Sequence, residues 1–152
     1  MVLHGGPVIR PLTETEAESL LVRNRIGRLA YAFHDRVDIE PINYVYDAPW
    51  IFGRTSTGAK LLKLAHNRWC AFETDTETGL FDWRSVVVKG PFETLDPTPG
   101  KTEKYERAVK ALRSLIPEAF SDRDPAPHRD VVFGIHVSEI EGRCSISQAV
   151  ES

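Results

Sequence analysis

The residues of this chain whose types and spacing could do chemistry lie together in residues 51–60, IFGRTSTGAK. Two apolar residues end an expected strand, and Arg54 and the hydroxyl residues 55–57 follow them. Gly58 then begins an apolar helix whose first turn carries Lys60. The N-terminus of a helix favours anions because it offers unpaired backbone N–H groups and partial positive charge. The segment therefore indicates a pocket for a phosphate monoester; the alternative is an ordinary polar turn with a solvated Arg and Lys.

Composition and charge exclude several other classes of protein. The 152 residues suggest a single domain, and 41% hydrophobic and 27% charged residues are typical of a soluble globular protein. A net charge of −3 without a basic run argues against nucleic-acid binding. No apolar stretch approaches the ~20 residues of a membrane span, and residues 1–12 lack a signal-peptide core. We therefore expect a cytoplasmic protein with no nucleic-acid or membrane partner.

The cysteines and histidines give no sign of metal or disulfide chemistry. Cys70 and Cys144 are far apart and form no CxxC motif, which indicates reduced thiols. The five His are scattered, and none pairs with another at metal-ligand spacing. The sequence therefore predicts no metal site.

Hydrophobic periodicity predicts the elements that position the phosphate segment. Residues 1–12, with two Gly and two Pro, form an expected extended arm, and Thr13 with Glu16 fits a capping box that begins a helix ending near residue 26. The expected strands are 27–34, 37–46, 50–54, 69–74, 83–92 and 131–137, followed by a short return strand over 143–147. Further helices are expected over 58–66 and from about 105 to Pro117, with loops over 75–79, 96–100 and 122–129.

Short connections between these strands favour antiparallel pairing, and closure into a small barrel would remove exposed edges. Pro41 lacks a backbone donor, so it should lie at an edge or a bulge. The β-branched residues 86–88 indicate a strand that is covered on both faces. The sequence thus predicts a mainly β fold, an antiparallel barrel of about six strands with peripheral helices.

Several segments match one known pattern in their order and spacing. They are residues 26–30 (IGRLA), 41–46 (PINYVY), 51–55 (IFGRT), 58–61 (GAKL), 67–73 (NRWCAFE) and 83–90 (WRSVVVKG). Over residues 13–95 the chain resembles the pyridoxamine 5′-phosphate oxidase-like, FMN-binding split β-barrel flavoproteins. The nearest branch includes the nitroimidazole-resistance reductases.

The resemblance implies a homodimer with an FMN in each of two clefts at the subunit interface. It places residues 41–44 beside the isoalloxazine ring, residues 54–56 and Lys60 at the phosphate, and residues 83–85 near the cofactor from the partner subunit. The cofactor-binding residues that it implies are Pro41, Ile42, Asn43, Tyr44, Phe52, Gly53, Arg54, Thr55, Ser56, Lys60, Trp83, Arg84 and Ser85. The phosphate residues agree with the anion pocket inferred from local chemistry.

The chain departs from the family pattern at two places. The nitroimidazole-reductase branch commonly has a His where Arg54 stands, which weighs against its specific nitro-reducing chemistry. The guanidinium of Arg54 matches phosphate oxygens in pairs instead. The basic substrate-phosphate signature of true pyridoxamine-phosphate oxidases is not evident near the C-terminus, where Arg143 is the one candidate. The vitamin-B6 reaction is therefore not expected.

The resemblance implies an FMN-dependent oxidoreductase. It would transfer hydride or electrons between a reductant such as NAD(P)H and a small nitroaromatic- or quinone-like acceptor. The sequence shows no obvious nucleophile or acid–base pair, so no catalytic residue is assigned, and it has no GxGxxG fingerprint for a resident dinucleotide. The alternatives are a flavin-binding or redox-sensing module without turnover, and a split barrel that binds F420 or haem.

Overall fold

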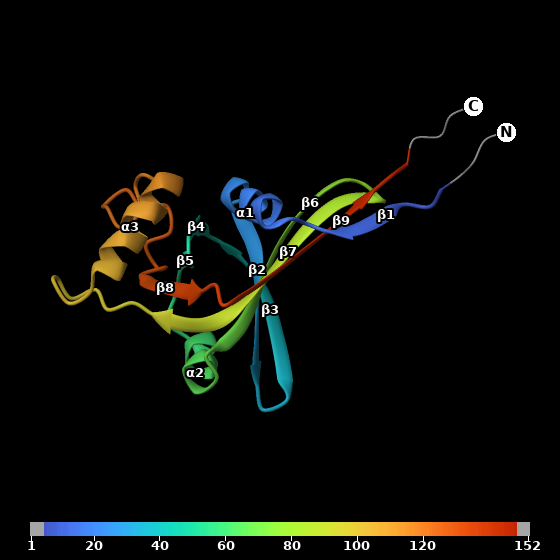
Figure 1. Cartoon of the computed structure of the whole chain (residues 1–152). Coiled ribbons are helices and arrows are strands. Elements are labelled where there is room, and N and C mark those ends of the chain that lie inside the picture. The colour runs from blue at the N-terminus through green and yellow to red at the C-terminus, as the bar shows by residue number, and fades with distance from the viewer. Residues whose placement is uncertain (1–4, 149–152) are drawn as a thin grey trace.

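Antiparallel strand pairing organises the chain, as the period-two patterning predicts (Figure 1). The computed structural model describes residues 5–148. The strands are β1 (Val8–Pro11), β2 (Ile26–Phe33), β3 (Arg36–Asn43), β4 (Val45–Asp47), β5 (Trp50–Thr55), β6 (Trp69–Gly79), β7 (Asp82–Thr94), β8 (Val131–His136) and β9 (Glu139–Ile146). The helices are α1 (Glu14–Arg23), α2 (Ala59–His66) and α3 (Glu103–Leu115).

The sheet divides at β7, which gives the fold its split form. The main strand order is β3-β2-β6-β7-β8-β5-β4, and β9 pairs with both β7 and β1. One edge of β7 pairs with β6, whereas the other pairs with β9 over residues 83–89 and with β8 over residues 92–94. Gly90 lies at this division, where an added Cβ would be 1.7 Å from the His136 carbonyl oxygen. The mainly β, antiparallel split-barrel prediction is confirmed.

The helices cover the sheet at different places. α1 packs Leu20 and Leu21 into the main core, where they join sheet residues such as Leu29 and Phe72. A second cluster lies under α3, which covers β5 and β8 at the other end of the molecule (Figure 1). α2 follows β5 and buries Leu64. Within residues 5–148, no helix is both long and apolar enough to cross a bilayer.

Several boundaries differ from the sequence prediction, and the described residues form nine strands instead of about six. The return strand expected over 143–147 runs from Glu139 to Ile146 as β9. Residues 8–11 of the expected N-terminal arm form β1 against β9, whereas residues 1–4 lie outside the described residues. Residues 75–79 continue β6, because long-range pairing with β7 does not require apolar side chains. The strand expected over 37–46 is broken at Tyr44. Pro41 does lie on an edge strand, since β3 pairs only with β2 among the described residues.

The break at Tyr44 has a local cause. Its backbone N–H donates to the Arg25 carbonyl (3.1 Å), and its hydroxyl donates to the Leu21 carbonyl at the C-terminal end of α1 (2.7 Å). The side chain is only 1% exposed. The N–H bond to Arg25 continues the β2–β3 register by one residue, the hydroxyl satisfies a helix-end carbonyl, and pairing with β5 begins at Val45.

The valine run is covered on one face only within this chain. Val86 and Val88 are fully buried, whereas Val87 points to the opposite face and is partly exposed. Cys70 and Cys144 are free and buried, and burial raises the pKa of the Cys70 thiol to about 12. These thiols are packing groups of the core.

Candidate functional site

A pocket of about 430 Å³ lies where β3, β5 and the start of α2 meet. Its lining residues are Glu40, Pro41, Ile42, Asn43, Arg54, Thr55, Ser56, Thr57, Gly58, Ala59, Lys60, His128 and Arg129. From the sequence-predicted set, the pocket brings together Pro41, Ile42, Asn43, Arg54, Thr55, Ser56 and Lys60. The two predicted segments, on the edge strand and at the strand–helix junction, therefore meet at one cavity.

The predicted phosphate-binding segment, residues 54–60, is positioned by the pairing of β5 with β8 and by the burial of Leu64 in α2. Thr55 is the last residue of β5, where it pairs with Val131 of β8, and Thr55 is buried. Gly58 is the N-cap residue of α2 and has no side chain that could accept from the first N–H groups of the helix. The Leu61 N–H donates to the Gly58 carbonyl (3.2 Å), whereas the N–H groups of Ala59 and Lys60 have no acceptor within a helix and are available to an anion.

Lys60 lies inside this arrangement with two polar neighbours. Its ammonium donates to Thr55 Oγ1 (2.8 Å) and pairs with the Glu40 carboxylate of β3. Its side chain is 18% exposed. The ammonium is thus held at the pocket, and an anion that binds there would compete with Glu40.

Arg54 borders the pocket but has a buried partner. Its guanidinium donates to both carboxylate oxygens of Asp124, at 2.5 and 2.8 Å, and the two side chains are 6% and 3% exposed. This hydrogen bonding holds the pKa of Asp124 well below its usual range. The ring of Phe120 lies 5.0 Å from the guanidinium carbon. The charge of Arg54 is therefore balanced within the chain, and its predicted contact with a phosphate stays a prediction.

The other predicted residues lie away from the pocket of the same chain. The side chains of Tyr44 and Phe52 are in the core, and an added Cβ at Gly53 would lie 2.4 Å from the Phe133 ring. Residues 83–85 are on β7 between β6 and β9. Their predicted approach to a cofactor from a partner subunit stays a prediction.

His128 and Arg129 are pocket residues that the sequence interpretation missed, since residues 122–129 were expected to be a polar loop. They precede β8, whose first residue pairs with the last residue of β5. Glu40 was missed as well. His128 and Arg129, one residue before a strong strand, were a signal in the sequence, but only the pairing of β5 with β8 brings them to the pocket.

A polar cluster on the sheet adjoins this pocket. Pro41, Arg28 and Glu73 are opposite one another on β3, β2 and β6, so their side chains share one face. Glu73 accepts from Ser85 Oγ (3.0 Å) and lies 3.4 Å from Arg28 Nη1. Burial is the main cause that raises the pKa of Glu73 to about 7, and the nearby Asp75 carboxyl is the next. The Ser85 hydrogen bond and the charge of Arg28 lower this pKa, but by less.

The chain belongs to the pyridoxamine 5′-phosphate oxidase family, whose model matches residues 13–144. The resemblance seen in the sequence is thereby confirmed. A FAD-binding protein from Mesorhizobium loti is 27% identical with a TM-score of 0.74, and the match covers 92% of this chain and 98% of that one.

Two further solved structures share the fold. A FAD-binding protein from Mycobacterium smegmatis is 24% identical with a TM-score of 0.65, covering 89% of this chain and 99% of that one. A candidate 5-nitroimidazole antibiotic resistance protein from Bacteroides thetaiotaomicron is 15% identical with a TM-score of 0.72, covering 100% and 96%. Comparison with curated proteins gives no significant match.

Proposed function

We propose that this chain binds FMN through its phosphate in the pocket between β3, β5 and α2, and acts as a flavin-dependent oxidoreductase. The observation that carries the proposal is the meeting of Lys60, Thr55, Ser56 and the N-terminus of α2 at one cavity. The similarity to a FAD-binding protein at 27% identity supports a flavin as the ligand.

The pocket residues fit a phosphate monoester. Lys60 supplies a charged donor, Thr55 and Ser56 supply hydroxyls, and the first turn of α2 supplies backbone N–H groups. The volume of about 430 Å³ lies within the range of roughly 300–1,000 Å³ typical of small-molecule sites. Glu40 is the carboxylate that a phosphate has to displace from Lys60.

The wall formed by Pro41, Ile42 and Asn43 on β3 gives the isoalloxazine ring a place beside the phosphate site. A bound flavin supplies hydride or electron transfer, and the chain binds and orients it. The proposed reductant is NAD(P)H, and the proposed acceptor is a small nitroaromatic- or quinone-like molecule. The proposed location is the cytoplasm.

The alternative functions are a flavin-binding or redox-sensing module without turnover, and a split barrel that takes F420 or haem. The absorption spectrum of the purified protein separates flavin, deazaflavin and haem. FMN-dependent oxidation of NADPH with a quinone acceptor separates an enzyme from a binding module. FAD belongs in the same titrations, because the M. loti relative is described as FAD-binding.

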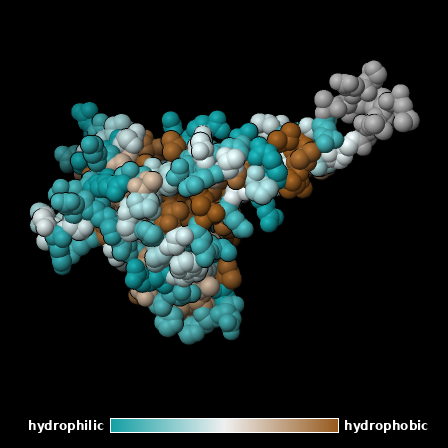
Figure 2. Space-filling model, viewed as in Figure 1, coloured by the Kyte–Doolittle hydropathy of each residue, from teal (hydrophilic) through white to brown (hydrophobic). Residues whose placement is uncertain are grey.

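We also propose a homodimer that forms over the apolar outer face of β3, β2 and β6. Val37 and Ile39 are 73% and 69% exposed, and Trp69 is 47% exposed. Val37 and Ile39 are opposite Ala32 and Ala30, so these side chains share one face. Val37, Ala30, Ala32 and Ala71 line a hollow of about 300 Å³ on that face. Figure 2 shows hydrophobic surface near the centre of the view, where several strands overlap in Figure 1, beside a mostly hydrophilic surface. A second copy is the proposed cover of this face, and it would bring its own residues 83–85 to the flavin.

Replacement of Lys60 tests the phosphate site. We expect Lys60→Ala to weaken FMN binding about 10- to 100-fold, because a charge-assisted hydrogen bond contributes roughly 1.5–3 kcal/mol. Riboflavin, which lacks the phosphate, should bind the variant and the native protein equally. Both affinities are measured by fluorescence titration.

Lys63→Ala is the matched control, since Lys63 is on the same helix, pairs with Asp38 and does not line the pocket. It should leave FMN affinity unchanged. Equal FMN affinity in the native protein and Lys60→Ala would reject the phosphate site. A native protein that binds FMN no better than riboflavin would reject the proposed function as a whole.

A further inference from the structure

A buried ion pair beside the pocket joins β5 to the segment that follows α3. The carboxylate of Asp124 accepts both guanidinium bonds of Arg54, and it also accepts from the backbone N–H groups of Phe120 (2.7 Å) and Ala126 (2.9 Å). Phe120 has a φ of 64°, in the left-handed region that a bulky residue rarely adopts. Asp124 is therefore the group around which this segment turns.

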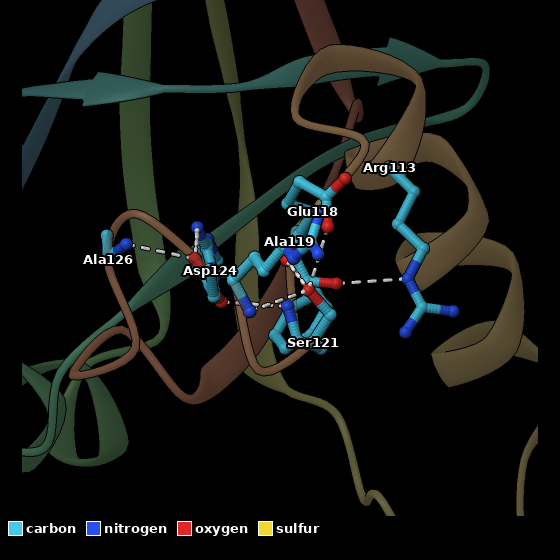
Figure 3. A network of polar contacts seen from close by, with 9 residues as sticks. Arg113, Glu118, Ala119, Ser121, Asp124 and Ala126 are labelled. Atoms are coloured by element: carbon cyan, nitrogen blue, oxygen red, sulfur yellow. Dashed lines mark hydrogen bonds and ion pairs between the residues drawn. The ribbon is translucent and has the colours of Figure 1, made fainter.

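Further contacts hold the same segment between α3 and the start of β8. Arg113 Nε donates to the Ala119 carbonyl (3.0 Å), and the Ser121 N–H donates to the Glu118 carbonyl (3.1 Å). The Arg129 N–H donates to the Ala126 carbonyl (3.0 Å). Figure 3 shows this network with Asp124 between the α3 end and Ala126. The segment thus has a defined path, and it ends at the pocket with His128 and Arg129.

The basic side chains that line the pocket differ in whether their charge is balanced. Arg54 pairs with Asp124, and Lys60 pairs with Glu40. Among residues 5–148, Arg129 has no carboxylate within ion-pairing distance and is exposed. Arg129 is therefore the lining residue whose positive charge is available to an anion without displacing an acid.

We propose that Arg129, with His128 beside it, is an anion-binding residue of this pocket, and that Asp124 is the residue that positions it. Asp124 does so by holding residues 120–129 against β5 through Arg54. The ligand chemistry is a phosphate monoester; its identity as the phosphate of a flavin rests on the proposed function. Arg54 then acts on the ligand through Asp124 and the segment that carries Arg129.

Titration of FMN and riboflavin into single and combined variants tests both parts of the proposal. Arg129→Ala should weaken FMN binding about tenfold or more and leave riboflavin binding unchanged. Arg123→Ala, on the same segment but outside the pocket lining, is the matched control and should change neither affinity. FMN affinity in Arg129→Ala equal to that of the native protein would overturn the anion-binding role.

Asp124→Asn should reduce the preference for FMN over riboflavin, and adding Arg129→Ala to it should cause little further loss. This non-additivity is the signature of positioning, because a displaced Arg129 has no contact left to lose. If Asp124 has only a structural role, Arg129→Ala will reduce FMN affinity equally in both backgrounds, and the positioning role is overturned.

Asp124→Asn leaves Arg54 buried without a counter-ion, so the fold itself could fail. The paired variant Arg54→Gln/Asp124→Asn removes both charges together, and the same non-additivity with Arg129→Ala is expected in it. Failure of this inference is distinguishable from failure of the proposed function. In the first case, Lys60→Ala still loses FMN selectively while Arg129→Ala does not; in the second case, the native protein has no preference for FMN over riboflavin.

Discussion

Lys60, Arg54 and Arg129 are similar in charge, yet their surroundings give them different chemistry. The Arg54 guanidinium is buried against the Asp124 carboxylate, which accepts four hydrogen bonds. If Arg54 turned to a ligand instead, the buried charge of Asp124 would lose its counter-ion. The Lys60 ammonium shares a more accessible carboxylate, which an incoming phosphate can displace. A basic residue in a binding motif is therefore a ligand contact only where its acidic neighbours leave its charge available.

Glu73 is expected to make stability depend on pH. Its pKa of about 7 in the folded protein lies above its ordinary value of 4.5. Between these values the folded protein holds a proton that the unfolded chain releases, so the free energy of unfolding falls as pH rises through this window. Glu73→Gln cannot titrate and should lose less stability between about pH 5 and about pH 8.

Urea unfolding at the two pH values measures this difference. Glu77→Gln, an exposed residue on the same strand, is the control and should follow the native pH dependence. A stability difference between Glu73→Gln and the native protein that is the same at both pH values would contradict the raised pKa of Glu73.

At the scale of elements, one tyrosine couples α1 to the strands that frame the pocket. Tyr44 lies between β3 and β4, and its hydroxyl satisfies the Leu21 carbonyl near the end of α1. Its ring packs edge-on against Phe72, with the ring centroids 4.6 Å apart. This contact fixes where β3 ends, and therefore where the pocket residues Pro41 and Asn43 lie.

Tyr44→Phe should lower the free energy of unfolding by about 1–3 kcal/mol, because it keeps the ring and leaves a buried carbonyl without its donor. Urea denaturation measures the loss. Tyr46→Phe is a matched control, since the Tyr46 hydroxyl donates to Glu18 at a less buried position (3.0 Å) and should cost less. A loss of stability no larger than that of Tyr46→Phe would reject the coupling.

At the scale of the whole molecule, the outer face of β3, β2 and β6 leaves large apolar side chains exposed. The inner face of β2 and β6 buries residues such as Leu29 and Phe72, whereas the outer face exposes Val37 and Ile39. Exposed apolar patches of this kind mark interaction surfaces in proteins. In the proposed homodimer a second copy covers this face, and each cofactor site would then be completed by residues of both chains.

Ile39→Glu should weaken dimerisation roughly 100-fold or more, because it places an unpaired charge in the proposed interface. Sedimentation velocity at micromolar concentration should give a dimer mass for the native protein and a monomer mass for the variant. Leu62→Glu is the control, since Leu62 is 76% exposed but lies on α2, outside the face formed by β3, β2 and β6. A native monomer, or an Ile39→Glu dimer as tight as the native one, would reject this interface.

The sequence by itself determined the features that depend on neighbouring residues. The alternation in β2 and β8, the turn before β5, the capping box of α1 and the start of α2 are local patterns, and each formed within a few residues of its predicted place. The phosphate segment was also readable, because Thr55, Ser56 and Lys60 are close together in the chain. Their order, with that of the other matching segments, sufficed for the family.

Only the tertiary structure decided what lies opposite these residues. Arg54 meets Asp124, 70 residues further along the chain, and Arg129 reaches the pocket because β8 pairs with β5. The side chain of Tyr44 turns into the core because a helix-end carbonyl needs a donor there. Such partners depend on strand register and on which buried polar groups must be satisfied. These are properties of the folded chain, and no local pattern of residues contains them.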